Sequence, residues 1–309
     1  MWAYLLLMTV RTILFIGLGI VAVALIVALV RALPKHRPVM PEPMRAVIGI
    51  AIGFVTNFFD TLGIGSFATT TSLFKFLRLV PDEKIPGTLN VGHALPTVAE
   101  AAIFIGIVAV EPRTLILLIL AAVAGAWLGA GFVARLPRRY IQIGMGTALL
   151  AAAILFIMSN LKGSQFGLVG TALGLEGVRL GIGIFVSFCL GALMTIGIGL
   201  YAPAMIMVSL LGMNPIAAFP IMMASCAFLM PVASLRFIRF DAFSMRSALG
   251  LTIGGIPGVL IAAFWIKQMN LVTLRWIVVV VVLYAAITML RSAAAPAPSE
   301  TEYAYAEGQ

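Results

Sequence analysis

The sequence predicts an all-α, polytopic membrane protein, and its composition is the first reason. Of the 309 residues, 62% are hydrophobic and 10% are charged, and the mean hydropathy is +1.14. Soluble domains are usually about 45–50% apolar and about 25% charged. This composition excludes an ordinary soluble enzyme, a nucleic-acid-binding module and a disordered chain. The isoelectric point of about 10.1 then reflects basic loops on one side of a membrane.

A duplicated series of apolar runs is the second reason. A first run, 12–30, is long enough for a spanning helix, which needs roughly 20 apolar residues. Two series follow, each made of one over-long run and three runs of spanning length. The first series is 46–80, 88–110, 114–135 and 140–159, and the second is 178–212, 216–235, 247–266 and 273–290.

These runs divide the chain into five parts. Residues 1–44 form an N-terminal transmembrane helix with a cytoplasmic connector, and the two transmembrane repeats are 45–160 and 177–291. An external linker, 161–176, joins the repeats. The tail, 292–309, is rich in Ala, Pro and Glu and is expected to be disordered and cytoplasmic.

A glycine-rich break divides each over-long run. As one straight helix, 46–80 would be about 50 Å long, against about 30 Å of hydrocarbon. Gly63-Ile64-Gly65 interrupts it, and Gly197-Ile198-Gly199 interrupts 178–212 at an offset of 134 residues. The same offset aligns prolines in the turns that follow the breaks. These pairs are Pro81 with Pro215 and Pro86 with Pro220.

Basic residues orient the helices, because Lys and Arg gather in cytoplasmic loops. Placing the three strongest clusters inside makes each over-long run begin and end on one side of the membrane. The economical structure for such a run is a re-entrant hairpin of two half-helices, and two short spans are the alternative. With three spans besides, the repeats are inverted relative to each other, and the N-terminus lies outside the cell membrane and the C-terminus in the cytoplasm. The clusters are Lys35/Arg37/Arg45, Arg135/Arg138/Arg139 and Arg236/Arg239/Arg246, whereas Arg11 falls outside.

Broken helices in inverted repeats are typical of secondary transporters, whose substrates bind where the breaks meet. Unwound backbone at membrane depth must be satisfied by protein, water or ligand. The N-terminal ends of half-helices offer free N–H groups and a positive dipole to an anion, and glycine lets the ligand approach closely. We therefore expect a small anionic substrate near the midplane.

The two glycine breaks, the duplicated proline-bearing turns and the chain length resemble the TauE/SafE family of membrane permeases, also called the sulfite or organosulfonate exporter family. The resemblance covers roughly 45–291 and implies export of sulfite, organosulfonates or other small anions. The sequence departs from the family's usual G-I-G-G-G at the first break, where Ser66 follows Gly65. Asp60 also stands where many members are apolar.

Polar side chains and glycines at predicted membrane depth are the candidates for function, because polar groups are costly there. The substrate-binding candidates are Gly63, Gly65, Ser66, Thr69, Thr70, Asn90, Thr195, Gly197, Gly199 and Tyr201. The proton-coupling candidates are Asp60, His93 and Glu100, and the candidates behind them are Asn57, Thr97, Ser225 and Cys226.

Several candidates have a structural alternative. Asp60 is either a proton carrier or the cap of the following half-helix. The hydroxyl groups after the break either bind substrate or bond back to their own helix. Tyr201 either lines the pathway or packs, and Cys226 is either redox-active or a small buried hydrophobe.

One helical stripe holds most of the ionisable candidates. Asn90, His93, Thr97 and Glu100 are spaced 3, 4 and 3 residues apart, which places them on one face. The stripe is either a proton relay or a static network that joins helices. The aligned positions of the second repeat lack ionisable groups, so coupling chemistry is expected in the first repeat only.

No enzyme motif accompanies these residues, since the sequence has no Walker A loop, no HExxH and no nucleophile elbow. We expect a proton-coupled secondary transporter without cofactor, metal or nucleic-acid partner, embedded in the lipid bilayer and compatible with a homodimer. Two alternatives stay open. They are an uncoupled, channel-like anion facilitator and a non-transporting membrane scaffold.

Overall fold

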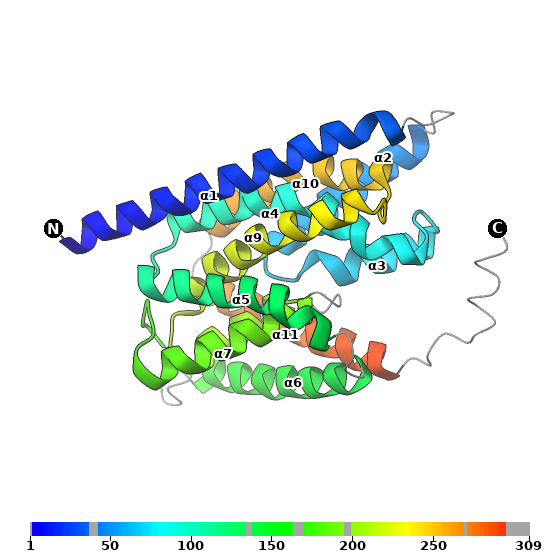
Figure 1. Ribbon diagram of the computed structural model, residues 1–309. Coiled ribbons are helices and arrows are strands. Elements are labelled where there is room, and N and C mark those ends of the chain that lie inside the picture. The colour runs from blue at the N-terminus through cyan, green and yellow to red at the C-terminus, as the bar shows by residue number, and fades with distance from the viewer. Residues whose placement is uncertain are drawn as a thin grey trace.

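The computed structural model describes residues 2–36, 43–133, 138–162, 170–194, 199–268 and 271–294, and in these ranges the chain is mainly helical (Figure 1). Five of the described helices are long and apolar enough to cross a membrane by length and composition. This confirms the predicted class of an all-helical, multi-pass membrane protein. The five are Met8–Ala32, Ile85–Ile107, Gly177–Met194, Pro215–Arg239 and Met245–Trp265.

Each predicted apolar run is a helix, or a pair of helices, close to the expected bounds. The first helix is α1, Trp2–Ala32. The first series is α2 (Pro43–Thr61), α3 (Ser66–Leu77), α4 (Ile85–Ile107), α5 (Pro112–Val133) and α6 (Arg138–Lys162). The second series is α7 (Gly177–Met194), α8 (Tyr201–Leu210), α9 (Ala218–Arg239), α10 (Met245–Gln268) and α11 (Leu271–Ala294). The tail beyond α11, 295–309, lies outside the described residues.

The broken runs are uneven. The 12 residues of α3 and the 10 of α8 make rods of about 15–18 Å at 1.5 Å per residue, too short to span. The 19 residues of α2 and the 18 of α7 make about 27–28 Å. Each broken run thus pairs one nearly spanning helix with one half-length helix, and the offset of 134 residues carries α2–α3 onto α7–α8.

The two series pack against each other through matching helices. Helix α2 lies along α10 and α7 along α5, while α4 packs on α9 and α6 on α11. Glycine permits the close approach, as small residues do in membrane interfaces. A Cβ on Gly254 of α10 would clash with the backbone of α2 at Ile50, and one on Gly191 of α7 would clash with Ala122 of α5. The contact between the series is therefore close enough to bring backbone against backbone.

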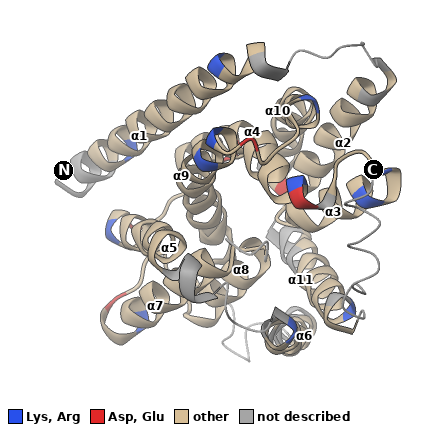
Figure 2. Ribbon diagram, turned by 45° about the vertical axis from the view of Figure 1, so that its right-hand side comes forward, with Lys and Arg blue, Asp and Glu red and all other residues tan. Residues whose placement is uncertain are grey.

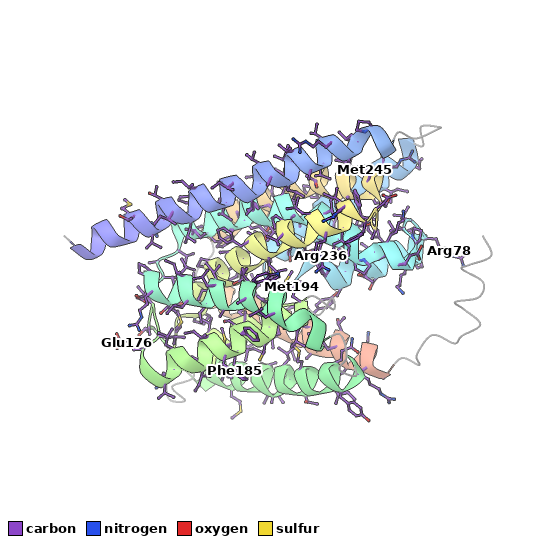
Figure 3. The ribbon with its side chains drawn as sticks, in the orientation of Figure 1. Arg78, Glu176, Phe185, Met194, Arg236 and Met245 are labelled. Carbon is purple, nitrogen blue, oxygen red and sulfur yellow. The ribbon has the colours of Figure 1, made fainter. Side chains whose placement is uncertain are left out.

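The helices run between two ends of the bundle. In Figure 1 the N-terminus of α1 lies at one end, and the ends of α3 and α11 and the turn between α9 and α10 lie at the other. Figure 2 shows charged residues at only a few positions of the ribbon. In Figure 3, Glu176 before α7 and Arg78 after α3 mark opposite ends, with Met194 between them. Helix α7 therefore ends near the middle of the bundle, where the second break begins.

Two contacts organise the end that holds Glu176. The Arg11 guanidinium donates to the Val108 carbonyl oxygen, with Nη2 and O 3.4 Å apart. Val108 follows α4, where the helix dipole is negative, so this basic residue has a local partner. The linker between the series is fastened to the turns of both, because the N–H groups of Glu111 and Asn214 donate to the carbonyls of Leu173 (2.7 Å) and Ala172 (2.9 Å).

Candidate functional site

The first break is a helix end closed by glycine. Gly63 has a φ of 96°. Its N–H donates to the Asp60 carbonyl at 2.7 Å, and the Ile64 N–H donates to the Phe59 carbonyl at 3.1 Å. This is the Schellman motif, whose left-handed residue is usually glycine. The motif ends α2, and α3 begins three residues after Gly63.

Asp60 caps α3. One carboxylate oxygen accepts the Ser66 N–H at 2.7 Å, and the other accepts the Ser66 hydroxyl at 3.0 Å. The side chain is buried. The capping role that the sequence left open is therefore present. The same carboxylate also lines the cavity between the breaks, so capping does not remove Asp60 from the candidate site.

The second break leads into α8 at Tyr201. The candidates Thr195 and Gly197 lie in 195–198, outside the described residues. Gly199 is described, and a Cβ on it would meet no heavy atom within 4 Å. The same is true of Gly65 before α3, although its φ of 86° would strain any other residue. Both glycines therefore border open space.

A cavity of about 80 Å³ lies where the two breaks meet. Residues 66–68 of α3 and 201–203 of α8 both line it. The first N–H groups of a helix have no intrahelical partner, and they carry the positive end of its dipole. Since a water needs about 10–15 Å³ by this measure, the cavity has room for several waters or one small oxyanion.

Glu100 joins the two series. It is fully buried on α4. Its Oε1 accepts the Thr61 hydroxyl at 2.8 Å, and its Oε2 accepts the Tyr201 hydroxyl at 3.0 Å. Thr61 is the last residue of α2 and Tyr201 is the first of α8. Any movement of α8 relative to α2 therefore has to break or carry these hydrogen bonds.

His93 forms a second buried network beside the first. Its Nδ1 lies 3.0 Å from Asn57 Oδ1, and its Nε2 lies 3.0 Å from Thr70 Oγ1. The Asn57 amide donates to the Gly53 carbonyl at 2.7 Å. Because an amide oxygen only accepts, Nδ1 carries a hydrogen, and the Thr70 hydroxyl donates to Nε2 of the neutral ring. His93 thus ties together α2, α3 and α4.

Thr97 is the member of the polar stripe that lines the cavity. Its side chain is 1% exposed, and its hydroxyl has no hydrogen-bond partner in the described part of the chain. Buried polar groups are nearly always hydrogen-bonded. An unpaired hydroxyl in a cavity wall therefore indicates a place for a water or a ligand.

The structure brings about half of the sequence candidates together. The wall of the cavity includes Asp60, Gly65, Ser66, Thr97, Gly199, Tyr201 and Cys226. Thr69 and Ser225 bond back to carbonyls of their own helices at 2.8 and 2.7 Å, and the amide of Asn90 does the same at 2.9 Å. These three are not part of the wall, and Gly63 closes the turn rather than facing the cavity.

Sequence reasoning missed the part of the wall that α7 and α11 supply. Met194, Tyr284 and Thr288 line the cavity, and the Cys226 Sγ lies 3.5 Å from the Met194 Sδ. No local signal marks Tyr284 or Thr288, because 273–290 reads as a uniform apolar span. Their place depends on how α11 packs in the bundle.

The wall is polar but lacks basic side chains. In its described part it contains no Lys, Arg or His. The described residues also contain no group of three or more His, Cys, Asp or Glu that could hold a metal ion. Helix ends, hydroxyl groups and one carboxyl group therefore provide the polar chemistry of this wall.

Comparison with known proteins gives a family match over most of the chain. The family model described as sulfite exporter TauE/SafE matches residues 3–156 and 179–307. The interval between the two matched segments contains the linker between the series. No curated protein and no solved structure matches the chain.

Proposed function

The chain belongs to the sulfite exporter TauE/SafE family, and on that premise we propose that it exports sulfite or an organosulfonate across the cell membrane as a secondary transporter. The family is one of membrane transporters, and the apolar helices support a multi-pass location. A small sulfur oxyanion is a substrate of suitable size for a cavity of about 80 Å³.

One observation carries the proposed binding site. The N-terminal turns of two half-length helices, α3 and α8, line the same cavity. Free N–H groups and positive dipole ends favour an anion. Glycine borders the cavity before each helix, at Gly65 and Gly199, which leaves room for the ligand to approach the backbone.

Alternating access follows from an inverted repeat, which we include in the proposal. It is supported by the pairing of matching helices between the series, α2 with α10 and α7 with α5. The basic turns after α3, α5 and α9 would lie in the cytoplasm. The substrate site would then sit between two repeats that rock against each other, with the N-terminus outside.

Proton coupling is the second part of the proposal. Two unit charges of like sign 4 Å apart repel by about 4 kcal/mol at an effective dielectric constant near 20. An anion in the cavity is therefore compatible with Asp60 and Glu100 only when these carboxyl groups are protonated. Transport of the anion would carry protons with it, and His93 would hold the helices that position the carboxyl groups.

Flux into proteoliposomes tests both parts. Purified protein would be reconstituted, and radiolabelled sulfite uptake would be measured with and without an imposed pH gradient. We expect the gradient to accelerate wild-type flux. Glu100→Gln would remove that dependence, whereas the matched control Glu83→Gln, at an exposed residue before α4, would retain it.

The alternatives predict different results in the same assay. Wild-type flux that ignores the pH gradient would remove the coupling and favour an uncoupled facilitator. Wild-type flux no greater than that of empty liposomes, for sulfite and for organosulfonates, would favour a membrane scaffold.

A further inference from the structure

We propose that the cavity selects oxyanions with a single negative charge, such as hydrogensulfite and monosulfonates, and rejects dianions such as sulfate and thiosulfate. This inference rests on the proposed function and adds the charge state of the substrate. It comes from the balance of charges around the cavity and from the unpaired hydroxyl of Thr97.

The positive charge available to a ligand is limited. The described wall contains no Lys, Arg or His, and the neighbouring segment 195–198 has no ionisable residue in its sequence. What remains is the positive end of α3 and of α8. Each helix end is equivalent to roughly half an elementary charge. Two ends therefore compensate about one negative charge.

Asp60 sets a condition on this balance. Its carboxyl group already occupies the end of α3 through Ser66. The other titratable groups around it are Glu100 on α4, Tyr201 on α8, Cys226 on α9 and Tyr284 on α11, none of which is a strong base. A bound monoanion requires Asp60 to be protonated, and a dianion would leave a further charge without compensation in a buried site.

The Thr97 hydroxyl provides a neutral contact for such a ligand. It is buried on α4 without a partner in the described part of the chain, and it lines the same cavity as the two helix ends. A hydroxyl donates a hydrogen bond to a sulfonate oxygen and adds no charge. The site thus combines three neutral or partial-charge donors, which suits a monoanion.

The test compares two anions of similar shape and different charge. Methanesulfonate is singly charged and sulfate is doubly charged at neutral pH, and both are tetrahedral. In proteoliposomes, methanesulfonate would inhibit radiolabelled sulfite flux at concentrations at least tenfold below those required of sulfate or thiosulfate. Thr97→Val would weaken inhibition by methanesulfonate and leave sulfate ineffective.

A charge added to the wall provides the converse test. Thr288→Lys would place a cation on α11 at the cavity and lower the sulfate concentration needed for inhibition by about tenfold or more. Thr288→Met is the matched control of similar length and would leave the preference unchanged.

The outcomes separate this inference from the proposed function. Sulfite flux that sulfate and methanesulfonate inhibit equally would overturn charge selection and leave sulfite export intact. Continued exclusion of sulfate by a Thr288→Lys protein that still carries sulfite would also overturn it. Absence of flux for every sulfur anion would instead remove the proposed function.

Discussion

Removing the Tyr201 hydroxyl tests whether Glu100 joins the two halves of the protein. Tyr201→Phe deletes the donor to Glu100 Oε2, which lies 3.0 Å away. Both side chains are buried, so water does not readily replace the hydroxyl. A hydrogen bond to a charged group contributes about 1.5–3 kcal/mol and one between neutral groups about 0.5–1.5 kcal/mol. We expect Tyr201→Phe to cost about 2 kcal/mol.

A double-mutant cycle isolates this interaction. In a Glu100→Gln background, Tyr201→Phe would cost about 1 kcal/mol, so the coupling energy between the two sites is expected to be about 1 kcal/mol. The assay is equilibrium unfolding of the purified protein in mixed micelles, with flux measured in parallel. Tyr140→Phe, at a residue of α6 that is 74% exposed, is the control and would leave stability unchanged. Additive effects within about 0.3 kcal/mol would refute the bridge.

Three further predictions concern helix ends and the His93 network. Arg78 after α3 has a φ of 49°, whereas its counterpart Gly212 after α8 is a glycine at 90°, so Arg78→Gly should raise the free energy of unfolding by about 1 kcal/mol. A melting temperature no higher than that of wild type would contradict this. Glu111 caps α5. Burial raises the pKa of Glu111, but hydrogen bonds from the first turn of α5 lower it more, so its pKa falls below the usual value. Its stabilising contribution is therefore complete above the unfolded-state pKa and lost as the pH falls through the folded-state pKa. Glu111→Gln should cost about 1 kcal/mol at neutral pH and less in acid, and an equal cost at both pH values would exclude the charged cap. Thr70→Val leaves His93 Nε2 without its partner and should cost about 1–3 kcal/mol of stability, which thermal unfolding would measure against no change if the contact is absent.

Much of the fold could be predicted because its signals are local. Apolar runs and basic clusters indicate spans and turns, and the glycines at 63–65 and 197–199 indicate two breaks. The helices follow these bounds within about one turn. The unequal lengths of α2 and α3 were not predicted, because the exact point where a helix ends depends on the Schellman turn at Gly63.

The site was predicted less completely because it is made by distant residues. Asp60 and Ser66 are six residues apart, and a cap was among the expectations. Glu100 and Tyr201 are 101 residues apart, and no pattern in the sequence pairs them. Thr288 entered the wall only through the packing of α11. Polar residues in apolar helices could therefore be recognised as candidates, but their partners required the tertiary structure.

The most direct measurement concerns the open space beside the second break. Gly199→Leu places four carbon atoms where a Cβ meets no heavy atom within 4 Å, at the edge of the cavity of about 80 Å³. Gly181→Leu is the matched control, since Gly181 is exposed on α7 and also has free space around its Cβ position. With both variants reconstituted in equal amounts, we expect Gly199→Leu to abolish sulfite flux and Gly181→Leu to retain it. Normal flux through Gly199→Leu would contradict a binding site between the two half-length helices.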